Sequence, residues 1–105
     1  MRDLRPILER LKQGLAAIYN DRLVSVLLYG SQSRGEAGDD SDVDVLVLLR
    51  DAVDPGDEIA RTSKLVSELS LQTDCVISCM YVSEDRYRRG GGPFLRNVRR
   101  EAVAL

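Results

Sequence analysis

The sequence predicts an α/β fold in which short apolar strands alternate with amphipathic helices. Apolar residues recur every three or four positions over the first twenty residues, which indicates a helix with one buried face. Apolar runs at 23–29, 43–49 and 74–82 are bounded by glycine, aspartate or serine, as strands are. Because the chain has 105 residues, we expect residues 1–105 to form a single domain with a modest core.

The helices are placed by their capping signals. The first is expected to end near Tyr19-Asn20, and Pro6 fits its first turn, where no internal N–H bond is lost. Asp57 is the expected N-cap of a second helix that runs to about Leu71, and Ser83 is expected to open a short helical turn. The side chains expected to face the core from the later helices are Ile59, Val66, Leu69, Phe94, Leu95 and Val98.

Composition excludes several classes of protein. The net charge of −2 argues against a general nucleic-acid coat protein, which would be strongly basic. No apolar run approaches the ~18 residues of a membrane span, and charges interrupt the N-terminus, so we expect no signal peptide. Without histidine a zinc site is not expected, and Cys75 and Cys79 lie too far apart along one strand to bridge each other. A cytoplasmic protein with two reduced thiols is the prediction.

Two carboxylates stand at the start of the second apolar run. Asp42 and Asp44 are two positions apart, so in a strand their side chains point to the same face, roughly 6–7 Å apart. Neighbouring carboxylates repel, and one tends to take up a proton unless a cation neutralises the pair. Oxygen ligands of this kind suit Mg²⁺, which keeps further positions for water and substrate phosphates.

The turn before these carboxylates supplies the complementary half of a site. At Gly30-Ser31 the glycine allows a phosphate to approach the backbone, and N–H groups and the serine hydroxyl can donate to its oxygens. An anion cradle beside a divalent-metal site is suited to phosphoryl or nucleotidyl transfer. The alternative is a plain turn with solvated aspartates, in which the charges at the start of the strand would serve no purpose.

These residues resemble a known family. Gly30-Ser31, ten residues and then Asp42-x-Asp44 are similar to the signature of the DNA polymerase β-like nucleotidyltransferases. With Arg34-Gly35 and the apolar run after Asp44, the chain resembles the minimal nucleotidyltransferases, often encoded beside HEPN-domain toxins. The resemblance implies a small mixed β-sheet with helices packed mainly on one face. It also implies a nucleoside triphosphate, with ATP as the expected substrate, held by Gly30, Ser31 and Arg34, and Mg²⁺ held by Asp42 and Asp44.

The third strand departs from the family pattern. Larger relatives carry a third carboxylate there, near the attacking hydroxyl. This chain offers Asp74 at the expected start of the strand and Ser78 on the same face four residues later. Asp74 is the candidate catalytic carboxylate, but a turn residue is an equally good interpretation of it. A serine holds Mg²⁺ less firmly than a carboxylate does and is no base at neutral pH.

The acceptor is expected to be another protein. Larger members of the superfamily carry extra helical domains that hold the acceptor, and this sequence shows none. The resemblance therefore implies a protein partner, a HEPN-type toxin that receives AMP on a tyrosine hydroxyl, and oligomers are possible. Two alternatives stay open: a binding module that neutralises its partner by contact alone, and transfer to RNA or a small molecule. The acidic balance and the few aromatic side chains count against RNA.

Overall fold

A computed structural model describes residues 4–30 and 42–105 of the chain. Its helices are α1 (Arg5–Tyr19), α2 (Pro55–Thr73), α3 (Glu84–Arg89) and α4 (Pro93–Glu101), and a 3₁₀ turn (Asn20–Arg22) follows α1. Its strands are β1 (Leu23–Tyr29), β2 (Val43–Leu49), β3 (Ile77–Ser83) and β4 (Val103–Ala104). The alternation of strands and helices predicted from the sequence is confirmed.

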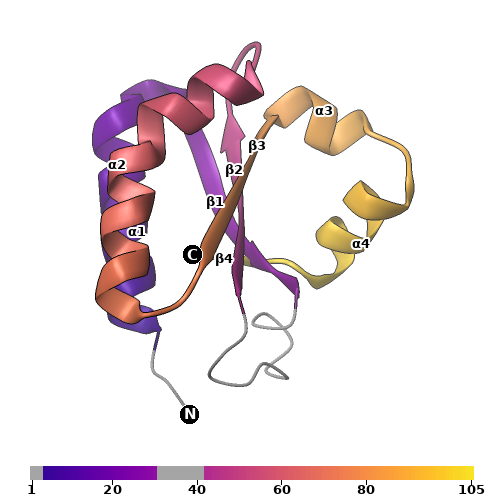
Figure 1. Cartoon of the computed structure of the whole chain (residues 1–105). Coiled ribbons are helices and arrows are strands. Elements are labelled where there is room, and N and C mark those ends of the chain that lie inside the picture. The colour runs from indigo at the N-terminus through magenta and orange to yellow at the C-terminus, as the bar shows by residue number, and fades with distance from the viewer. Residues whose placement is uncertain (1–3, 31–41) are drawn as a thin grey trace.

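The four strands form one mixed sheet in the order β3-β2-β1-β4. β2 pairs antiparallel with β1 and parallel with β3, while β4 pairs antiparallel with β1. The connection from β2 through α2 to the parallel strand β3 is a βαβ crossover, which places α2 against one face of the sheet (Figure 1). β3 is therefore one edge of the sheet and β4 the other.

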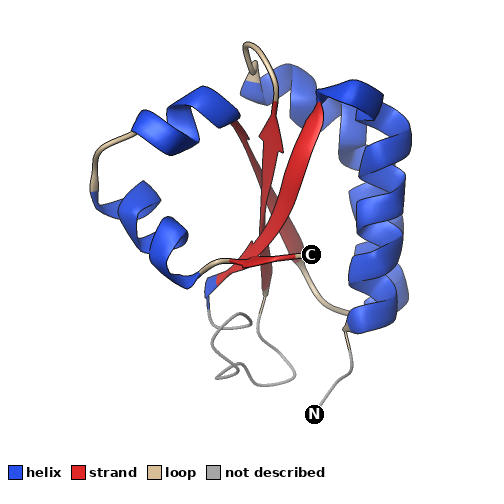
Figure 2. Ribbon diagram, turned by 180° about the vertical axis from the view of Figure 1, so that it is seen from behind, coloured by secondary structure: helices blue, strands red, loops and turns tan. Residues whose placement is uncertain are grey.

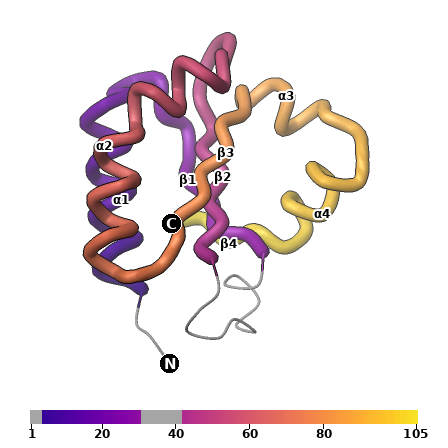
Figure 3. Tube along the Cα trace, in the orientation of Figure 1, coloured from indigo at the N-terminus to yellow at the C-terminus, as the bar shows by residue number. Residues whose placement is uncertain are grey.

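Helices cover both faces of the sheet, but unequally. The long helices α1 and α2 lie side by side on one face, and the short helices α3 and α4 lie on the other (Figures 1 and 2). The tube in Figure 3 shows how α3 and α4 leave the end of β3 and return the chain to β4. The predicted mixed sheet with its main helical layer on one face is confirmed, and the C-terminal helices add a second, smaller layer.

Strand β2 lies at the centre of the core. Its side chains alternate between the faces: Val43, Val45, Val47 and Leu49 join the cluster under α1 and α2, whereas Leu46 and Leu48 join the cluster toward α3 and α4. Five consecutive residues, 45 to 49, are buried, as expected for a strand with helices on both sides. The apolar stripe of α1 supplies Leu8, Leu11, Leu15 and Tyr19 to the larger cluster.

Two element boundaries differ from the sequence prediction. The N-cap of α2 is Asp54, whose Oδ1 accepts the N–H of Asp57 at 3.2 Å, so the predicted cap at Asp57 is wrong. Pro55 can occupy the first helical position without losing a bond, and this extends the helix upstream. At the other end, α2 continues to Thr73 and is capped by Asp74 in a left-handed conformation, so β3 starts at Ile77. Ser83 caps α3 as predicted, accepting the N–H of Arg86 at 3.1 Å.

Two apolar side chains expected in the core are exposed instead. Ile59 on α2 is 55% exposed and Phe94 on α4 is 45% exposed, whereas Leu69, Leu95 and Val98 are buried as predicted. Helical periodicity identifies the apolar stripe but does not tell which of its members other elements leave uncovered.

Two further expectations concern the cysteines and membranes. Cys75 and Cys79 are both free and half-buried, and Cys75 precedes β3 rather than lying in it. Burial raises the pKa of the Cys79 thiol to about 11, which keeps it protonated. No helix among residues 4–30 and 42–105 is long and apolar enough to cross a bilayer.

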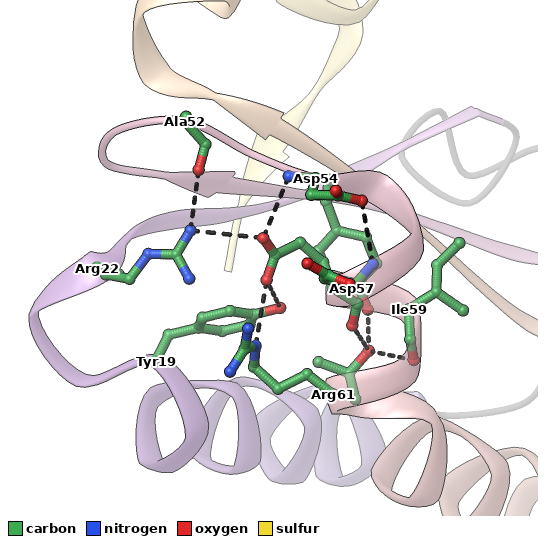
Figure 4. A network of polar contacts seen from close by, with 10 residues as sticks. Tyr19, Arg22, Ala52, Asp54, Asp57, Ile59 and Arg61 are labelled. Atoms are coloured by element: carbon green, nitrogen blue, oxygen red, sulfur yellow. Dashed lines mark hydrogen bonds and ion pairs between the residues drawn. The ribbon is translucent and has the colours of Figure 1, made fainter.

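A buried carboxylate ties α1, the 3₁₀ turn after it and α2 together (Figure 4). Glu58 is only 3% exposed; its Oε1 accepts from the Tyr19 hydroxyl at 3.1 Å and the Arg61 Nε at 3.3 Å. Its Oε2 accepts from Arg22 at 3.5 Å and from the backbone N–H of Asp54 at 3.4 Å. Burial by itself would raise the pKa of Glu58, but the hydrogen bonds from Tyr19, Asp54 and Arg22 lower it overall.

We expect Glu58→Gln to lower the free energy of unfolding at pH 7 by about 1–3 kcal/mol, because hydrogen bonds to a charged acceptor are lost. The folded-state pKa of Glu58 is depressed, so its contribution is complete above the unfolded pKa and disappears as the pH falls through the folded value. The difference between variant and wild type should therefore shrink in acid. Urea denaturation across the pH range measures it.

The matched control is Glu68→Gln, an exposed glutamate on the same helix, which should change stability by no more than about 0.5 kcal/mol. A Glu58→Gln variant as stable as this control at pH 7 would contradict the structural role of the network.

Candidate active site

The sheet register brings three polar side chains into one row. Asp44 on β2 pairs with Tyr29 on β1 and with Ser78 on β3. Because paired residues project to the same face of a sheet, and Leu46 and Val82 farther along these strands belong to the cluster toward α3 and α4, the row faces that side. The row Tyr29–Asp44–Ser78 lies at the end of the sheet where β1 ends and β2 begins.

Gly30 directly follows Tyr29, at the β1 end of this row. Its φ is +76°, in the left-handed region, and a Cβ added to it would lie 2.7 Å from Oδ2 of Asp44. An L side chain here would be strained by the backbone and would collide with the carboxylate. Glycine is therefore required at this turn, and the Asp44 carboxylate lies directly against its backbone, as the sequence predicted for the two halves of the site.

The charge of Asp44 is unfavourable in the folded chain. Its carboxyl group is half-buried, and its pKa is raised first by burial and second by the negative charge of Asp42. Burial, followed by the charge of Asp44, also raises the pKa of the Tyr29 phenol, so this hydroxyl stays protonated at neutral pH. Asp42 is exposed just before the strand.

The chemistry of this pair fits a divalent cation. A cation beside Asp42 and Asp44 would offset both the burial of a charge and the mutual repulsion, and Mg²⁺ accepts one or two carboxylates with its other positions open. Among the residues that the structure describes, no three histidine, cysteine or acidic side chains come together as a metal cluster. Two carboxylates by themselves leave most positions around a Mg²⁺ ion for water and substrate oxygens.

The structure separates the other predicted site residues. Ser31 and Arg34 lie outside the described residues, so their role in binding the triphosphate stays a prediction. Asp74 is exposed at the C-terminal cap of α2, with φ +54°, and precedes β3 by three residues. Ser78 occupies the position beside Asp44 that Asp74 would need, and the catalytic role of Asp74 stays a prediction that the register does not favour.

An aromatic pair next to the row was not predicted. Phe94 from α4 packs edge-on against Tyr29, with ring centroids 5.8 Å apart, and remains 45% exposed. The contact brings the C-terminal helix over the sheet face that carries Asp44. The only hint in the sequence was an aromatic residue within the closing helix, which periodicity assigned to the core.

The fold agrees with the comparisons to known proteins. Residues 8–101 match the model of the nucleotidyltransferase domain family. The chain belongs to this family. It is also 36% identical over 72 residues, 69% of its length and 72% of the relative's, to a protein of Methanocaldococcus jannaschii whose name assigns it provisionally to the protein adenylyltransferases.

Two solved structures illustrate the relationship. One, provisionally named a minimal nucleotidyltransferase, is 30% identical with a TM-score of 0.59, and the match covers 99% of this chain and 97% of that one. The other comes from a complex of a tri-AMPylated HEPN toxin of Shewanella oneidensis with an MNT antitoxin. It has a TM-score of 0.61 at 17% identity, covers 97% of this chain and 71% of that one, and shows a common fold.

The unfavourable charge of Asp44 leads to a prediction about stability. We expect Asp44→Asn to raise the melting temperature at pH 7 by about 2–5 °C in the absence of metal, since the neutral amide removes the penalty of a buried, repelled charge. The folded-state pKa of Asp44 is raised, so the wild type loses stability as the pH rises through the window between its unfolded and folded pKa values. Thermal denaturation followed by circular dichroism from pH 4 to 8 should show the gain growing with pH.

Asp51→Asn serves as the control, because Asp51 is exposed beyond the opposite end of β2 and has a positive φ that asparagine tolerates. If Asp44→Asn melted at the same temperature as this control throughout the pH range, the assigned electrostatic cost would be wrong.

Proposed function

We propose that this chain is a Mg²⁺-dependent nucleotidyltransferase that moves AMP from ATP onto a hydroxyl of a partner protein, and that this partner is a HEPN-type toxin. The observation that carries the proposal is the Asp44 carboxylate against the positive-φ Gly30, with Asp42 beside it. This juxtaposition supports a cation site and a phosphate-binding turn within reach of one substrate.

The residues of the proposed site divide the work of this reaction between them. The Gly30 turn lets the β- and γ-phosphates approach the backbone, with Ser31 and Arg34 as the predicted donors. Asp42 and Asp44 would hold Mg²⁺, which when bound polarises the α-phosphate and stabilises the departing pyrophosphate. Tyr29, with its raised pKa, forms a neutral wall on the β1 side of the carboxylates.

Several findings support a protein acceptor. The relative from Methanocaldococcus jannaschii carries the name of a protein adenylyltransferase, and the toxin in the Shewanella oneidensis complex is AMPylated. A partner protein of this kind would present its own hydroxyl group to the Asp44 face of the sheet.

The direct test is transfer from α-³²P-ATP. With Mg²⁺ and a purified HEPN-domain protein, the wild type should label the protein, and Asp42→Asn and Asp44→Asn should each reduce the rate at least about 100-fold, because each removes a metal ligand. EDTA should abolish labelling. Asp51→Asn should transfer at the wild-type rate, and a wild type that labels nothing would contradict the proposal.

One observation favours a second candidate function, neutralisation of the partner by contact alone. The residue beside Asp44 on β3 is Ser78, which is neither a strong metal ligand nor a base. A binding module of this kind would still neutralise its toxin when Asp42 and Asp44 are both asparagine. It would fail when arginine or apolar side chains on α4 are changed.

The third carboxylate is tested by a pair of variants. Asparagine tolerates the left-handed conformation of Asp74, so Asp74→Asn should keep the fold and leave the transfer rate within about twofold of wild type. Ser78→Asp places a carboxylate beside Asp44 and should raise the rate about tenfold if a weak third ligand limits catalysis. A large loss in Asp74→Asn would instead assign the third carboxylate to Asp74.

A further inference from the structure

The outer edge of β3 is lined by a groove with apolar walls. A cavity of about 290 Å³ is bounded by Ile59 of α2 on one side of the strand and by Met80, Arg86 and Phe94 on the other. A second cavity of about 380 Å³ continues along the strand between β3 and α2 and shares Ile59, Cys79 and Tyr81 with the first. Ile59, Met80 and Phe94 are 55%, 44% and 45% exposed, so three large apolar side chains face solvent around one opening.

The backbone at this edge is available for pairing. Val43 donates its N–H to the carbonyl oxygen of Val76 at 2.8 Å, so the even-numbered residues of β3 point their polar groups toward β2. In a parallel ladder the intervening residues point the other way, and the N–H of Ile77 indeed turns outward to the Ser70 hydroxyl at 3.3 Å. Cys79 and Tyr81 therefore present N–H and carbonyl groups to the groove, where another strand could bind them.

The groove lies beside the candidate active site along β3. Met80 follows Ser78 by two positions on the same face of β3, and Ser78 is the register partner of Asp44. By strand geometry the Cα atoms of Met80 and Asp44 lie roughly 8 Å apart. In an in-line transfer the attacking and departing oxygens lie on opposite sides of the phosphorus atom. With the pyrophosphate over the Gly30 turn, the acceptor has to arrive from the β3 side, past Ser78 and Met80.

The charge beside the groove indicates the character of its occupant. Residues 84–101, which form α3, α4 and their connection, contain six arginines against three acidic residues. Arg86 lines the groove, is exposed and has no ion-pair partner among the described residues. A second copy of this chain, paired edge to edge, would bring its own arginine-rich residues 84–101 to the groove, and like charges would repel. An acidic segment of a different protein would be attracted.

We propose that the β3 edge is the docking site for the acceptor protein, which adds an extended segment to β3. Alternate apolar side chains of that segment lie against Ile59, Met80 and Phe94, and an acidic residue meets Arg86. The acceptor hydroxyl is thereby carried to the Asp44 face. This inference rests on the proposed function for the identity of the partner, but the docking itself requires no chemistry.

Binding is therefore measured without nucleotide, by calorimetry with the same purified HEPN-domain protein as the probe. Ile59→Glu and Met80→Glu should each weaken its binding at least about tenfold, because a charge would be placed in an apolar contact. Both positions are exposed, so the melting temperature should stay near that of the wild type. The matched control is Leu71→Glu, an 83% exposed apolar position on the same helix as Ile59 but outside the groove, which should bind like the wild type.

Hydrogen exchange provides the readout specific to strand addition. The amides of Cys79 and Tyr81 should exchange faster than those of Ser78 and Met80 in the free chain, and should become protected when the probe binds. Equal binding by Ile59→Glu and Leu71→Glu, absence of protection at these two amides, or no binding by the wild type would each overturn the proposal. A wild-type dimer that Ile59→Glu dissociates would assign the edge to a second copy instead and would also overturn it.

The two proposals fail separately. If the wild type binds the probe at the β3 edge but transfers no AMP, the docking site stands and the enzymatic function falls. If transfer occurs with the same apparent affinity for the probe in Ile59→Glu as in wild type, the function stands and the docking site falls.

Discussion

The burial of β2 on both faces is the constraint on which the rest of this structure depends. A strand covered by α1 and α2 on one side and by α3 and α4 on the other must be apolar along its length, and residues 45–49 satisfy this requirement. Charge can be accommodated only at the end of such a strand, where solvent reaches it. Asp44 stands at that end, beside the glycine that ends β1, because the antiparallel register of β1 and β2 brings the two positions together.

The same register explains which parts of the site could be predicted from the sequence. The strands containing residues 23–29 and 43–49 have continuous apolar patterns, so their bounds and the proximity of Gly30 to Asp44 followed from the pattern and the short connection. The start of the third strand was predicted three residues too early, because Thr73 and Asp74 have no strong preference for helix or strand. The left-handed cap at Asp74 depends on how α2 packs. Because of that error, Asp74 was predicted to lie in the sheet. The structure puts Ser78 there instead.

The exposed apolar side chains show a different limit. Ile59 and Phe94 obey the helical periodicity of a buried face, yet both line the opening beside β3 and remain largely exposed, because the described residues supply no further strand at this edge. A pattern of apolar residues records which side of a helix is turned toward the sheet and not how far the sheet extends. At the edge of a sheet, an apolar pattern that resembles a core therefore indicates an interface.

The cost of Asp44 bears on whether the chain is an enzyme or only a binding module. A carboxylate that is half-buried and repelled by Asp42 destabilises the folded chain, and the packing of β2 does not require it, since its neighbours on the strand are apolar. The required glycine opposite it adds a second restriction that serves no apolar contact. Contact-only neutralisation would leave both features without a purpose, whereas binding of a cation and a triphosphate uses both at once. In the proposed reaction the weak point is Ser78, the register partner of Asp44, because a serine holds a metal ion less firmly than a carboxylate does and is no base at neutral pH.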